Sequence, residues 1–414
     1  LMFAGVPLAV AMGLAGVAVV AAADLGMLSL PTNVYTGIAK YPLMAIPVFV
    51  IAGLIFERAG VAATIVRFAS ALVGQRRGSL AIVAILVAMI LGGISGSGPA
   101  DSAAVGAVML PSMLKAGYPR AFTAGVIAAA GSTDILIPPS IAFVIYSLLV
   151  PQASVPALFA AGMIPGILSG LTLVLVAWWL SVRHGFEANV ADERPPFWQS
   201  LKDAGWGLLA PVIILGGMRS GLFTPTEAAV VAAVYALLVA TLVYREMTWR
   251  QTVDVFVSAA RTTAVIMFLV AAAMVSAWLI TVADIPSKMV SLLEPFMDNQ
   301  TLLLIAIMLL VMAVGTAMDM TPTILIMTPV LMPVVKAAGI DPVYFGVLFI
   351  MNNAIGLITP PVGTVLNVVA GVGRMKMDDV TRGVLPFMTA QFAVMFLLVF
   401  FPGLVTVPAR WFAG

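Results

Sequence analysis

The sequence predicts an all-α polytopic membrane protein, built as two inverted-topology repeats that each contain a re-entrant helical hairpin and a broken helix. The composition is the first observation, since 62% of the 414 residues are hydrophobic, 9% are charged and the mean hydropathy is +1.13. Such a chain cannot bury its apolar surface in one soluble core. The second observation is that apolar stretches close to the ~18 residues that span a bilayer recur along the chain. The third is a pattern of proline and glycine that occurs twice.

The duplicated pattern is a proline, then a glycine, then a pair of prolines. It occurs once in each half of the chain, at Pro111, Gly117 and Pro138-Pro139 and again at Pro333, Gly339 and Pro360-Pro361. Both copies have the same spacing, at an offset of 222 positions, and Gly93 and Gly315 share that offset. Duplicated membrane units with interrupted helices are typical of secondary transporters.

The first half is predicted to begin with a span at residues 1–23, which lacks a preceding basic segment and therefore differs from a signal peptide. A second span at 42–57 and a short amphipathic helix at 61–73 follow. The next segment, residues 79–115, has two apolar arms and is predicted to form a hairpin. Its tip at 92–101 is too rich in glycine and polar residues to face lipid.

The helix after this hairpin is predicted to be broken by the sequence Ile137-Pro138-Pro139-Ser140. Between the two hairpins we expect five crossings, an odd number that inverts the second repeat, centred near residues 137, 170, 211, 235 and 271. The second half then repeats the layout, with an amphipathic helix at 286–296 and a hairpin at 301–336 whose tip is at 315–323. A segment broken by residues 358–363 and a final span at 385–407 follow. About ten spanning segments are expected, besides two segments that enter and leave the membrane on the same side.

The basic residues support this topology. If the first hairpin opens toward the cytoplasm, fifteen of the twenty lysines and arginines lie on that side. The other side keeps Lys40, Arg219, Lys288, Lys336 and Arg410. An excess of basic residues on the cytoplasmic side is the usual bias of membrane proteins. A cytoplasmic linker between the repeats is expected near residues 186–200.

Helices that break at membrane depth leave backbone donors and acceptors that polar groups must satisfy. A proline favours the first position of a helix, so Pro99, Pro139, Pro322 and Pro361 are each expected to begin a half-helix. Converging helix N-termini attract an anion. The carbonyls that end the preceding half-helices, with hydroxyls such as those of Ser95, Ser97 and Thr359, suit a hard cation such as sodium.

Four ordered motifs make the chain similar to a known family over its whole length. They are Gly93-Ile94-Ser95-Gly96-Ser97 with Ala100-Asp101, Ile137-Pro138-Pro139-Ser140, Gly221-Leu222-Phe223-Thr224-Pro225-Thr226-Glu227-Ala228-Ala229, and Gly356-Leu357-Ile358-Thr359-Pro360-Pro361-Val362-Gly363. They resemble the large, DctM-like membrane subunit (M subunit) of TRAP transporters, the tripartite ATP-independent periplasmic family.

The resemblance implies a sodium-driven importer of an organic acid, such as a C4-dicarboxylate or sialic acid, that works by an elevator mechanism in the bacterial inner membrane. It also implies a small four-helix membrane subunit and a periplasmic substrate-binding protein as partners, with membrane lipids around the chain. Sodium would be the coupling ion, and no organic cofactor is expected. The net charge of +2 gives no reason to expect a nucleic acid.

The family's sodium positions in the second repeat match Gly315, Gly356, Thr359 and Val362. The offset of 222 maps these onto Gly93, Asp134, Ile137 and Ser140. We expect the first sodium site at Gly93, Ser95, Ser97 and Asp134, with backbone carbonyls of residues 132–135. Substrate contacts are expected at Ser97, Asp101, Ser140, Asp319, Thr321 and Thr364.

The sequence departs from the family pattern in two places. Gly98-Pro99 stand where small apolar residues are usual, and Asp134 stands where glycine is common. Asp134 therefore places an extra carboxylate near the first cation site, or else is a buried structural carboxyl. Similarly, Asp101 and Asp319 are expected either to contact ion or substrate or only to cap their helices. Glu227 is expected to be a helix-start acid.

The expected transport domain consists of the two hairpins with their broken helices, at residues 79–157 and 301–377. Residues 1–78, 158–300 and 378–414 are expected to form the scaffold, with the amphipathic arms.

Other classes of function fit less well. A stand-alone sodium/carboxylate symporter of the related inverted-hairpin class would need neither a binding protein nor the motif at 221–229. A channel would need a continuous polar pore, whereas the polar residues concentrate at two tips, and these tips also argue against a purely structural subunit. An enzyme is not expected, because the chain has no cysteine and no nucleophile placed with a base.

Overall fold

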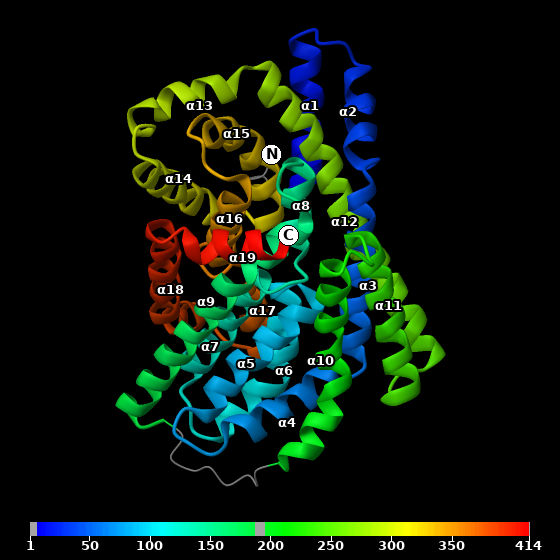
Figure 1. Cartoon of the computed structure of the whole chain (residues 1–414), viewed down its shortest axis with the longest axis vertical. Helices are drawn as coiled ribbons and strands as arrows, with labels where there is room; N and C mark the ends of the chain where they lie inside the picture. The colour runs from blue at the N-terminus through cyan, green and yellow to red at the C-terminus, as the bar shows by residue number, and fades with distance from the viewer. Residues whose placement is uncertain (1–5, 187–194, 414) are drawn as a thin grey trace.

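The computed structural model describes residues 6–186 and 195–413, and their side chains up to residue 410. Every regular element in these ranges is helical. Figure 1 shows an elongated bundle in which the first hairpin (α5 and α6) lies toward the lower end and the second hairpin (α14 and α15) toward the upper end. The start of the first predicted span and residues 187–194 of the predicted linker lie outside the described residues.

The helices of the first half follow the predicted order. They are α1 (Leu8–Ala22), α2 (Ser29–Ile38), the short 3₁₀ turn η2 (Tyr41–Met44), α3 (Ala45–Arg58), α4 (Val61–Val73), α5 (Ser79–Ser95), α6 (Gly98–Lys115), α7 (Arg120–Thr133), the 3₁₀ turn η3 (Asp134–Leu136) and α8 (Ile141–Leu149). The amphipathic helix, the hairpin and the broken helix are confirmed as helical elements. Only α2 has no counterpart among the predicted elements.

The remaining helices complete the bundle. They are α9 (Val155–His184), α10 (Phe197–Arg219), α11 (Pro225–Leu238) with the π-turn η4 (Val239–Val243), α12 (Trp249–Val282), α13 (Ile285–Leu293) with η5 (Glu294–Phe296), α14 (Gln300–Gly315), α15 (Met320–Ala337), α16 (Pro342–Gly356), α17 (Thr364–Gly373), α18 (Met377–Phe400) and α19 (Gly403–Ala413). The second hairpin is therefore helical as predicted, and the helix that follows it is interrupted between Gly356 and Thr364, which confirms the second predicted break.

The prediction of a single final span at 385–407 was wrong. Helix α18 ends at Phe400, and α19 begins at Gly403. Pro402 explains the interruption, because a proline disfavours helical geometry in the residue before it. Phe401 accordingly has φ −122° and ψ 71°, outside the helical region.

The predicted count of about ten spans was too high by the criteria of helix length and hydropathy. Within the described residues, seven helices are long and apolar enough to cross a membrane, or eight if α7 and α8 form one bent span. Helix α1 has only 15 residues. Helices α16 and α17 have 15 and 10 residues and are separated by the break at 357–363.

The expectation that four prolines begin half-helices was half right. Pro99 and Pro322 lie in the first turns of α6 and α15. Pro139 and Pro361 instead lie inside the breaks, where each forms a cis peptide bond with the preceding proline. Ser140 after Pro139 is extended, at φ −128° and ψ 124°, so α8 starts only at the next residue.

Glu227 is confirmed as a helix-start acid. Its carboxylate accepts a hydrogen bond from the backbone N–H of Thr224 at 2.8 Å, and the Thr224 hydroxyl in turn accepts from the N–H of Glu227. This reciprocal arrangement is a capping box, which satisfies two backbone donors at the start of α11.

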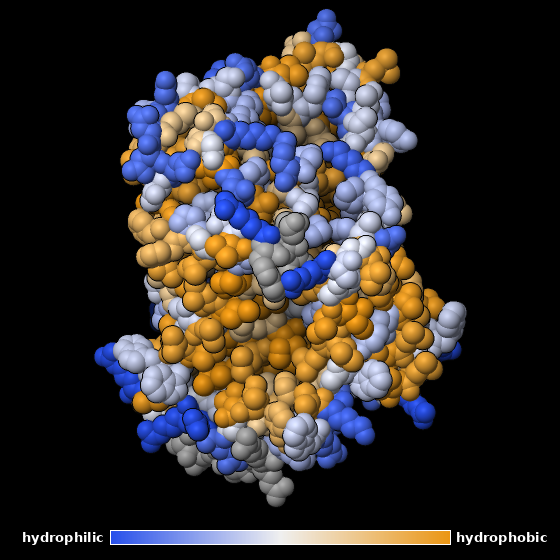
Figure 2. All heavy atoms as spheres, in the orientation of Figure 1, coloured by the Kyte–Doolittle hydropathy of each residue, from blue (hydrophilic) through white to orange (hydrophobic). Residues whose placement is uncertain are grey.

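Apolar side chains form a band around the bundle. Figure 2 shows this band over α9, α10 and α11, between two ends where hydrophilic side chains gather. Leu175, Val212 and Val234 are among the exposed apolar residues of these elements. Such a belt matches a protein whose solvent is the bilayer.

Helices of the expected scaffold pack on one another, whereas the broken helices pack on the hairpins. Helix α3 packs against α11 and α12, and α10 packs against α4 and α11. The broken helices pack elsewhere: α8 lies against α15 of the second hairpin, and α17 lies against α6 of the first. Each half-helix that follows a break therefore packs against the hairpin of the other half of the chain.

Candidate functional site

The tip of the first hairpin is closed by a hydrogen bond between its two arms. The Ser95 hydroxyl at the end of α5 donates to Oδ2 of Asp101 in the first turn of α6, at 2.6 Å. The Ser95 oxygen also accepts from the backbone N–H of Ser97 at 3.2 Å. Asp101 is 4% exposed, and in the described structure its carboxylate accepts from the Ser95 hydroxyl and from no backbone N–H of α6. The capping interpretation of Asp101 is therefore wrong, because its carboxylate is used to join the two arms.

Glycines let this tip approach the broken helix. A Cβ on Gly96, at φ +64°, would overlap the carbonyl oxygen of Pro139. A Cβ on Gly98 would overlap the carbonyl oxygen of Gly131, and one on Gly92 would overlap Asp134. Only residues without a side chain allow so close an approach of two backbones. The tip and the break therefore form one compact unit.

Asp134 lies at the centre of this contact and is fully buried. Neither of its carboxylate oxygens has a hydrogen-bond partner among the described residues, and the Asp101 carboxyl acts on it electrostatically. The Ser140 hydroxyl, on the other side of the break, is also buried without a partner in the described part of the chain. Buried polar oxygens without donors are costly unless something positive satisfies them. These oxygens fit a small cation.

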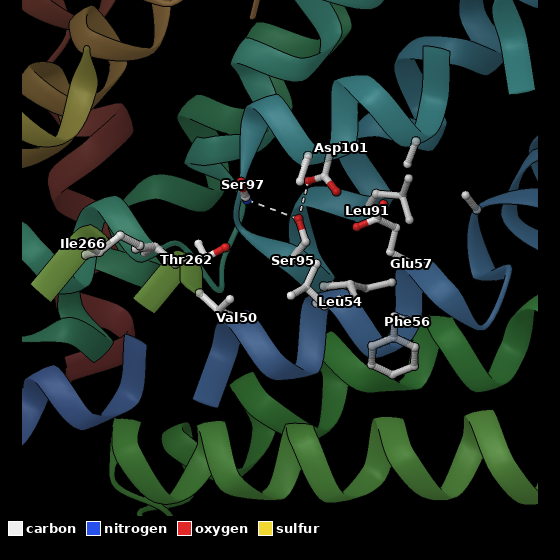
Figure 3. Close-up of a pocket in the computed structure, with 16 residues that line it drawn as sticks. Val50, Leu54, Phe56, Glu57, Leu91, Ser95, Ser97, Asp101, Thr262 and Ile266 are labelled. Atoms are coloured by element: carbon white, nitrogen blue, oxygen red, sulfur yellow. Dashed lines mark hydrogen bonds between the residues drawn. The ribbon is translucent and has the colours of Figure 1, made fainter. Parts of the chain in front are cut away.

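A cavity of about 160 Å³ adjoins the first tip. Its polar lining comes from Glu57 of α3, Ser95, Ser97, Asp101 and Thr262 of α12. Figure 3 shows the Glu57 side chain reaching toward the place where Ser95 and Asp101 meet. The cavity thus brings two carboxylates and three hydroxyls together between the hairpin and helices α3 and α12.

The second tip meets its break in a similar way. The Cα of Gly356, at the end of α16, lies 3.7 Å from the position of a Cβ on Gly315, at the end of α14. The N–H of Val362 in the break donates to the carbonyl of Thr316 at 3.4 Å. Thr359 donates its hydroxyl hydrogen to the carbonyl of Ile355 at 2.8 Å. The four sodium positions expected in the second half are therefore placed around one contact.

Asp319 and Thr364 are also brought together at this end. Asp319 stands just before α15, and its Oδ1 accepts from the hydroxyl of Thr364, the first residue of α17, at 3.0 Å. Its side chain makes no capping hydrogen bond, so the capping interpretation of Asp319 is wrong. Thr321 lies in the first turn of α15 and is partly exposed. Unlike the buried Asp101, Asp319 is exposed.

The structure thus divides the predicted site residues into two clusters. The first contains Gly93, Ser95, Ser97, Asp101, Asp134 and Ser140, and the second contains Gly315, Asp319, Thr321, Gly356, Thr359, Val362 and Thr364. The clusters are linked through α17, which packs on α6, and through α16, which packs on η3.

Three polar residues near the first cluster were missed in the sequence. Glu57 and Thr262 line the cavity, and Gln391 of α18 bonds to the last turn of α7. Each stands within or beside an apolar helix, and an isolated polar residue in such a helix is the signal that could have identified it.

The chemistry available at these clusters suits binding more than catalysis. The described residues contain no group of three or more His, Cys, Asp or Glu side chains that could hold a metal. The donors are instead hydroxyls, backbone carbonyls and single carboxylates, which suit a weakly held hard cation. The start of α17, which Gly363 precedes at φ +32°, adds backbone N–H groups that favour an anion.

Comparison with known proteins identifies the same family as the sequence motifs. Residues 1–404 match the model of the family described as "Tripartite ATP-independent periplasmic transporter, DctM component". The chain is 47% identical over 408 residues to the 2,3-diketo-L-gulonate TRAP transporter large permease protein YiaN of Escherichia coli, a match that covers 98% of this chain and 96% of that protein. It is 38% identical over 378 residues to the sialic acid TRAP transporter large permease protein SiaM of Vibrio cholerae, covering 91% and 88%.

A solved structure shares the fold at low sequence identity. The structure of MtrF from Neisseria gonorrhoeae has a TM-score of 0.65 and 14% sequence identity, and the match covers 92% of this chain and 86% of that one. At this identity the likeness concerns only the fold, that of an all-helical protein with several membrane spans.

Proposed function

Because the chain belongs to the family of DctM components of TRAP transporters, and is thus a multi-pass permease of organic anions and not an enzyme, we propose that it imports an organic acid anion together with sodium. The substrate would arrive from a periplasmic substrate-binding protein, and a small membrane subunit would complete the permease in the inner membrane. The relatives named above are described as permeases for 2,3-diketo-L-gulonate and sialic acid. Both are sugar acids, so we expect a carboxylate in the substrate.

The single observation that carries the proposal is the pair of contacts between hairpin tips and helix breaks. At each contact, close backbone approach combines with hydroxyls and helix-ending carbonyls. Interrupted helices at membrane depth place cation-binding carbonyls and anion-binding N–H groups side by side. One pair of elements can therefore bind both the coupling ion and the transported anion.

The proposed second sodium site lies at the contact of α14 with α16. Its ligands would be Gly315, Gly356, Thr359 and Val362, mostly through backbone carbonyls. Its support is that the ends of both helices touch at Gly315 and Gly356, and that the break folds back to Thr316. Helix-terminal carbonyls carry partial negative charge, which favours a cation there.

The proposed first sodium site combines Asp134 with Gly93, Ser95 and Ser97. The buried, donor-free oxygens of Asp134 support it. We assign Asp101 to this site in place of a substrate contact, because Asp101 already holds Ser95 and its negative charge would repel an anionic substrate. The cavity with Glu57 and Thr262 provides a polar approach for the cation.

The proposed substrate contacts are Ser97, Ser140, Thr321 and Thr364, with Asp319 as a positioning group. Thr364 stands at the start of α17, where backbone N–H groups point outward, and Asp319 orients its hydroxyl. A substrate carboxylate could accept from the backbone N–H groups at the start of α17 and from the hydroxyls of Ser97, Ser140 and Thr321, without needing a basic side chain.

We propose further that the hairpins and broken helices move as one body past helices α3 and α12. The packing of α8 on α15 and of α17 on α6 supports this, because the half-helix of each repeat contacts the hairpin of the other. The tip of the first hairpin meets the expected scaffold at Gly53 of α3, where a Cβ would lie 3.2 Å from the Cα of Ser95. Because Gly53 has no side chain, α3 presents no projection to the tip at this point, which suits sliding of the tip past α3.

Uptake into proteoliposomes tests the proposed function. The purified chain and its small membrane partner are reconstituted, and labelled organic acids are supplied with or without the cognate binding protein under an imposed sodium gradient. Uptake that requires both sodium and the binding protein supports the proposal. Uptake driven by sodium without the binding protein would instead indicate the stand-alone symporter, and uptake indifferent to sodium would refute the coupling.

A further inference from the structure

A buried polar cluster joins three helices behind the first tip. Gln391 of α18 is 2% exposed, and its Nε2 donates to the hydroxyl of Thr133 at 2.5 Å. The same nitrogen lies 3.0 Å from the Ser132 hydroxyl and 3.2 Å from the carbonyl of Ala129. The Thr133 hydroxyl also lies 3.4 Å from that of Ser169 on α9. All the partners of Gln391 belong to the last turns of α7.

Burying these polar groups inside an apolar bundle costs free energy unless they are hydrogen-bonded. Transfer of an amide out of water without compensation costs about 2 kcal/mol or more. The Gln391 amide is compensated by its contacts with α7, so the position of α7 and the position of α18 depend on each other. The backbones are also in direct contact, because a Cβ on Gly383 of α18 would overlap the carbonyl of Ala121 on α7.

The turn that Gln391 holds is also the turn that ends at the first candidate cation site. Thr133 is the last residue of α7, and Asp134 follows it. The carbonyl of Gly131 and the backbone of Asp134 meet the hairpin at Gly98 and Gly92. One side of the turn therefore contacts the hairpin tip, while the hydroxyls of Ser132 and Thr133 contact α18.

We propose that Gln391 is a positioning residue for the first cation site. It fixes the last turn of α7 so that the helix-ending carbonyls and Asp134 are presented to the hairpin tip. The inference rests on the proposed sodium coupling. It also places α18 and α9 in the body that carries the site, whereas the sequence led us to expect both in the scaffold.

The proposal can be tested without destroying the fold. Gln391→Met keeps an unbranched side chain of similar length but removes every hydrogen bond to α7. Ser132 and Thr133 are not left without acceptors, because each hydroxyl also lies within hydrogen-bond distance of the Ala129 carbonyl, at 2.8 and 3.1 Å. Thr389→Val is the matched control, since Thr389 is an exposed residue of the same helix whose hydroxyl donates only to the carbonyl of Pro386 in its own helix.

The primary measurement is sodium binding, read as thermal stabilisation of the purified protein during titration with sodium chloride against choline chloride. Groups that orient metal ligands commonly change affinity by about tenfold or more, so Gln391→Met should raise the half-maximal sodium concentration about tenfold. Thr389→Val should leave it unchanged. Thr133→Val should weaken sodium binding as well. The double variant, Gln391→Met with Thr133→Val, should bind sodium no more weakly than either single variant, because both changes break the same contact.

Uptake provides a second measurement that a purely structural role would not change in the same way. With Gln391→Met, the sodium concentration for half-maximal uptake should rise, while the maximal rate at saturating sodium stays close to that of the unmodified protein. A sodium titration of Gln391→Met and Thr133→Val that matches the unmodified protein would overturn the inference and leave the proposed coupling intact. An unmodified protein that shows no stabilisation by sodium would overturn the proposed coupling, and the inference with it.

Discussion

Gly315 and Gly356 touch backbone to backbone, which joins the end of the second hairpin's first arm to the end of α16. The contact is not symmetric. A Cβ on Gly315 would lie 3.7 Å from the Cα of Gly356, an ordinary distance, whereas a Cβ on Gly356 would lie 3.2 Å from the carbonyl oxygen of Gly315. The two glycines therefore make different demands on the proposed second sodium site.

We predict that Gly356→Ala weakens sodium binding while Gly315→Ala is tolerated. The added methyl of Gly356→Ala displaces the carbonyl of Gly315, a proposed ligand, and a loss of about 1.4 kcal/mol corresponds to a tenfold loss in affinity. Sodium titrations of uptake in proteoliposomes measure the effect. Equal behaviour of the two variants would remove the Gly315 carbonyl from the proposed site.

Thr359→Val should affect sodium and Thr364→Val should affect the substrate. Both changes remove one hydroxyl and keep the shape of the side chain, so each serves as the control for the other. We expect Thr359→Val to raise the sodium concentration for half-maximal uptake, and Thr364→Val to raise the KM for the organic acid at saturating sodium. Membrane insertion should be normal in both, and a reversed pattern would exchange the two assignments.

Asp134→Asn should weaken sodium binding more strongly than it weakens folding. The carboxyl is fully buried and has no hydrogen-bond partner in the described structure, so Asp134→Asn removes a negative charge that would help to hold the proposed cation. Asp134→Gly, which restores the residue expected for the family, provides the comparison. Thermal stability and its sodium dependence are measured for each. A carboxylate with a purely structural role would instead give a large loss of stability and an unchanged sodium response.

Gly96→Ala should disrupt the first tip, while Gly117→Ala should cost only backbone strain. Both glycines have positive φ, +64° and +89°, so each substitution carries a strain of about 1–2 kcal/mol. Only at Gly96 does the new Cβ also overlap a neighbour, the carbonyl of Pro139, whereas nothing lies within 4 Å of the Cβ position at Gly117. The temperature of unfolding in detergent and uptake should both fall more for Gly96→Ala. If the two variants behave alike, the close contact between tip and break is not needed.

Much of the fold was predictable because it depends on local properties of the chain. Apolar length identified the long helices, and the glycine and proline pattern located both tips and both breaks. The capping box of Thr224 and Glu227 is likewise a short-range interaction. The errors arose where a neighbour in the chain changed the backbone, as Pro402 does by ending α18, or where the length of a break was not encoded in composition.

The site was predictable as a set of residues but not as an arrangement. The sequence by itself determined that polar oxygens gather at two interrupted segments, because a bilayer tolerates such segments only where protein groups satisfy them. Only the tertiary structure decided which groups meet: that Asp101 bonds to Ser95 and not to its own helix start, that Asp134 has no donor, and that Gln391 reaches Thr133 across 258 positions. Long-range partners of this kind depend on how helices pack, and helix packing is set by the shapes of whole surfaces and not by any local pattern.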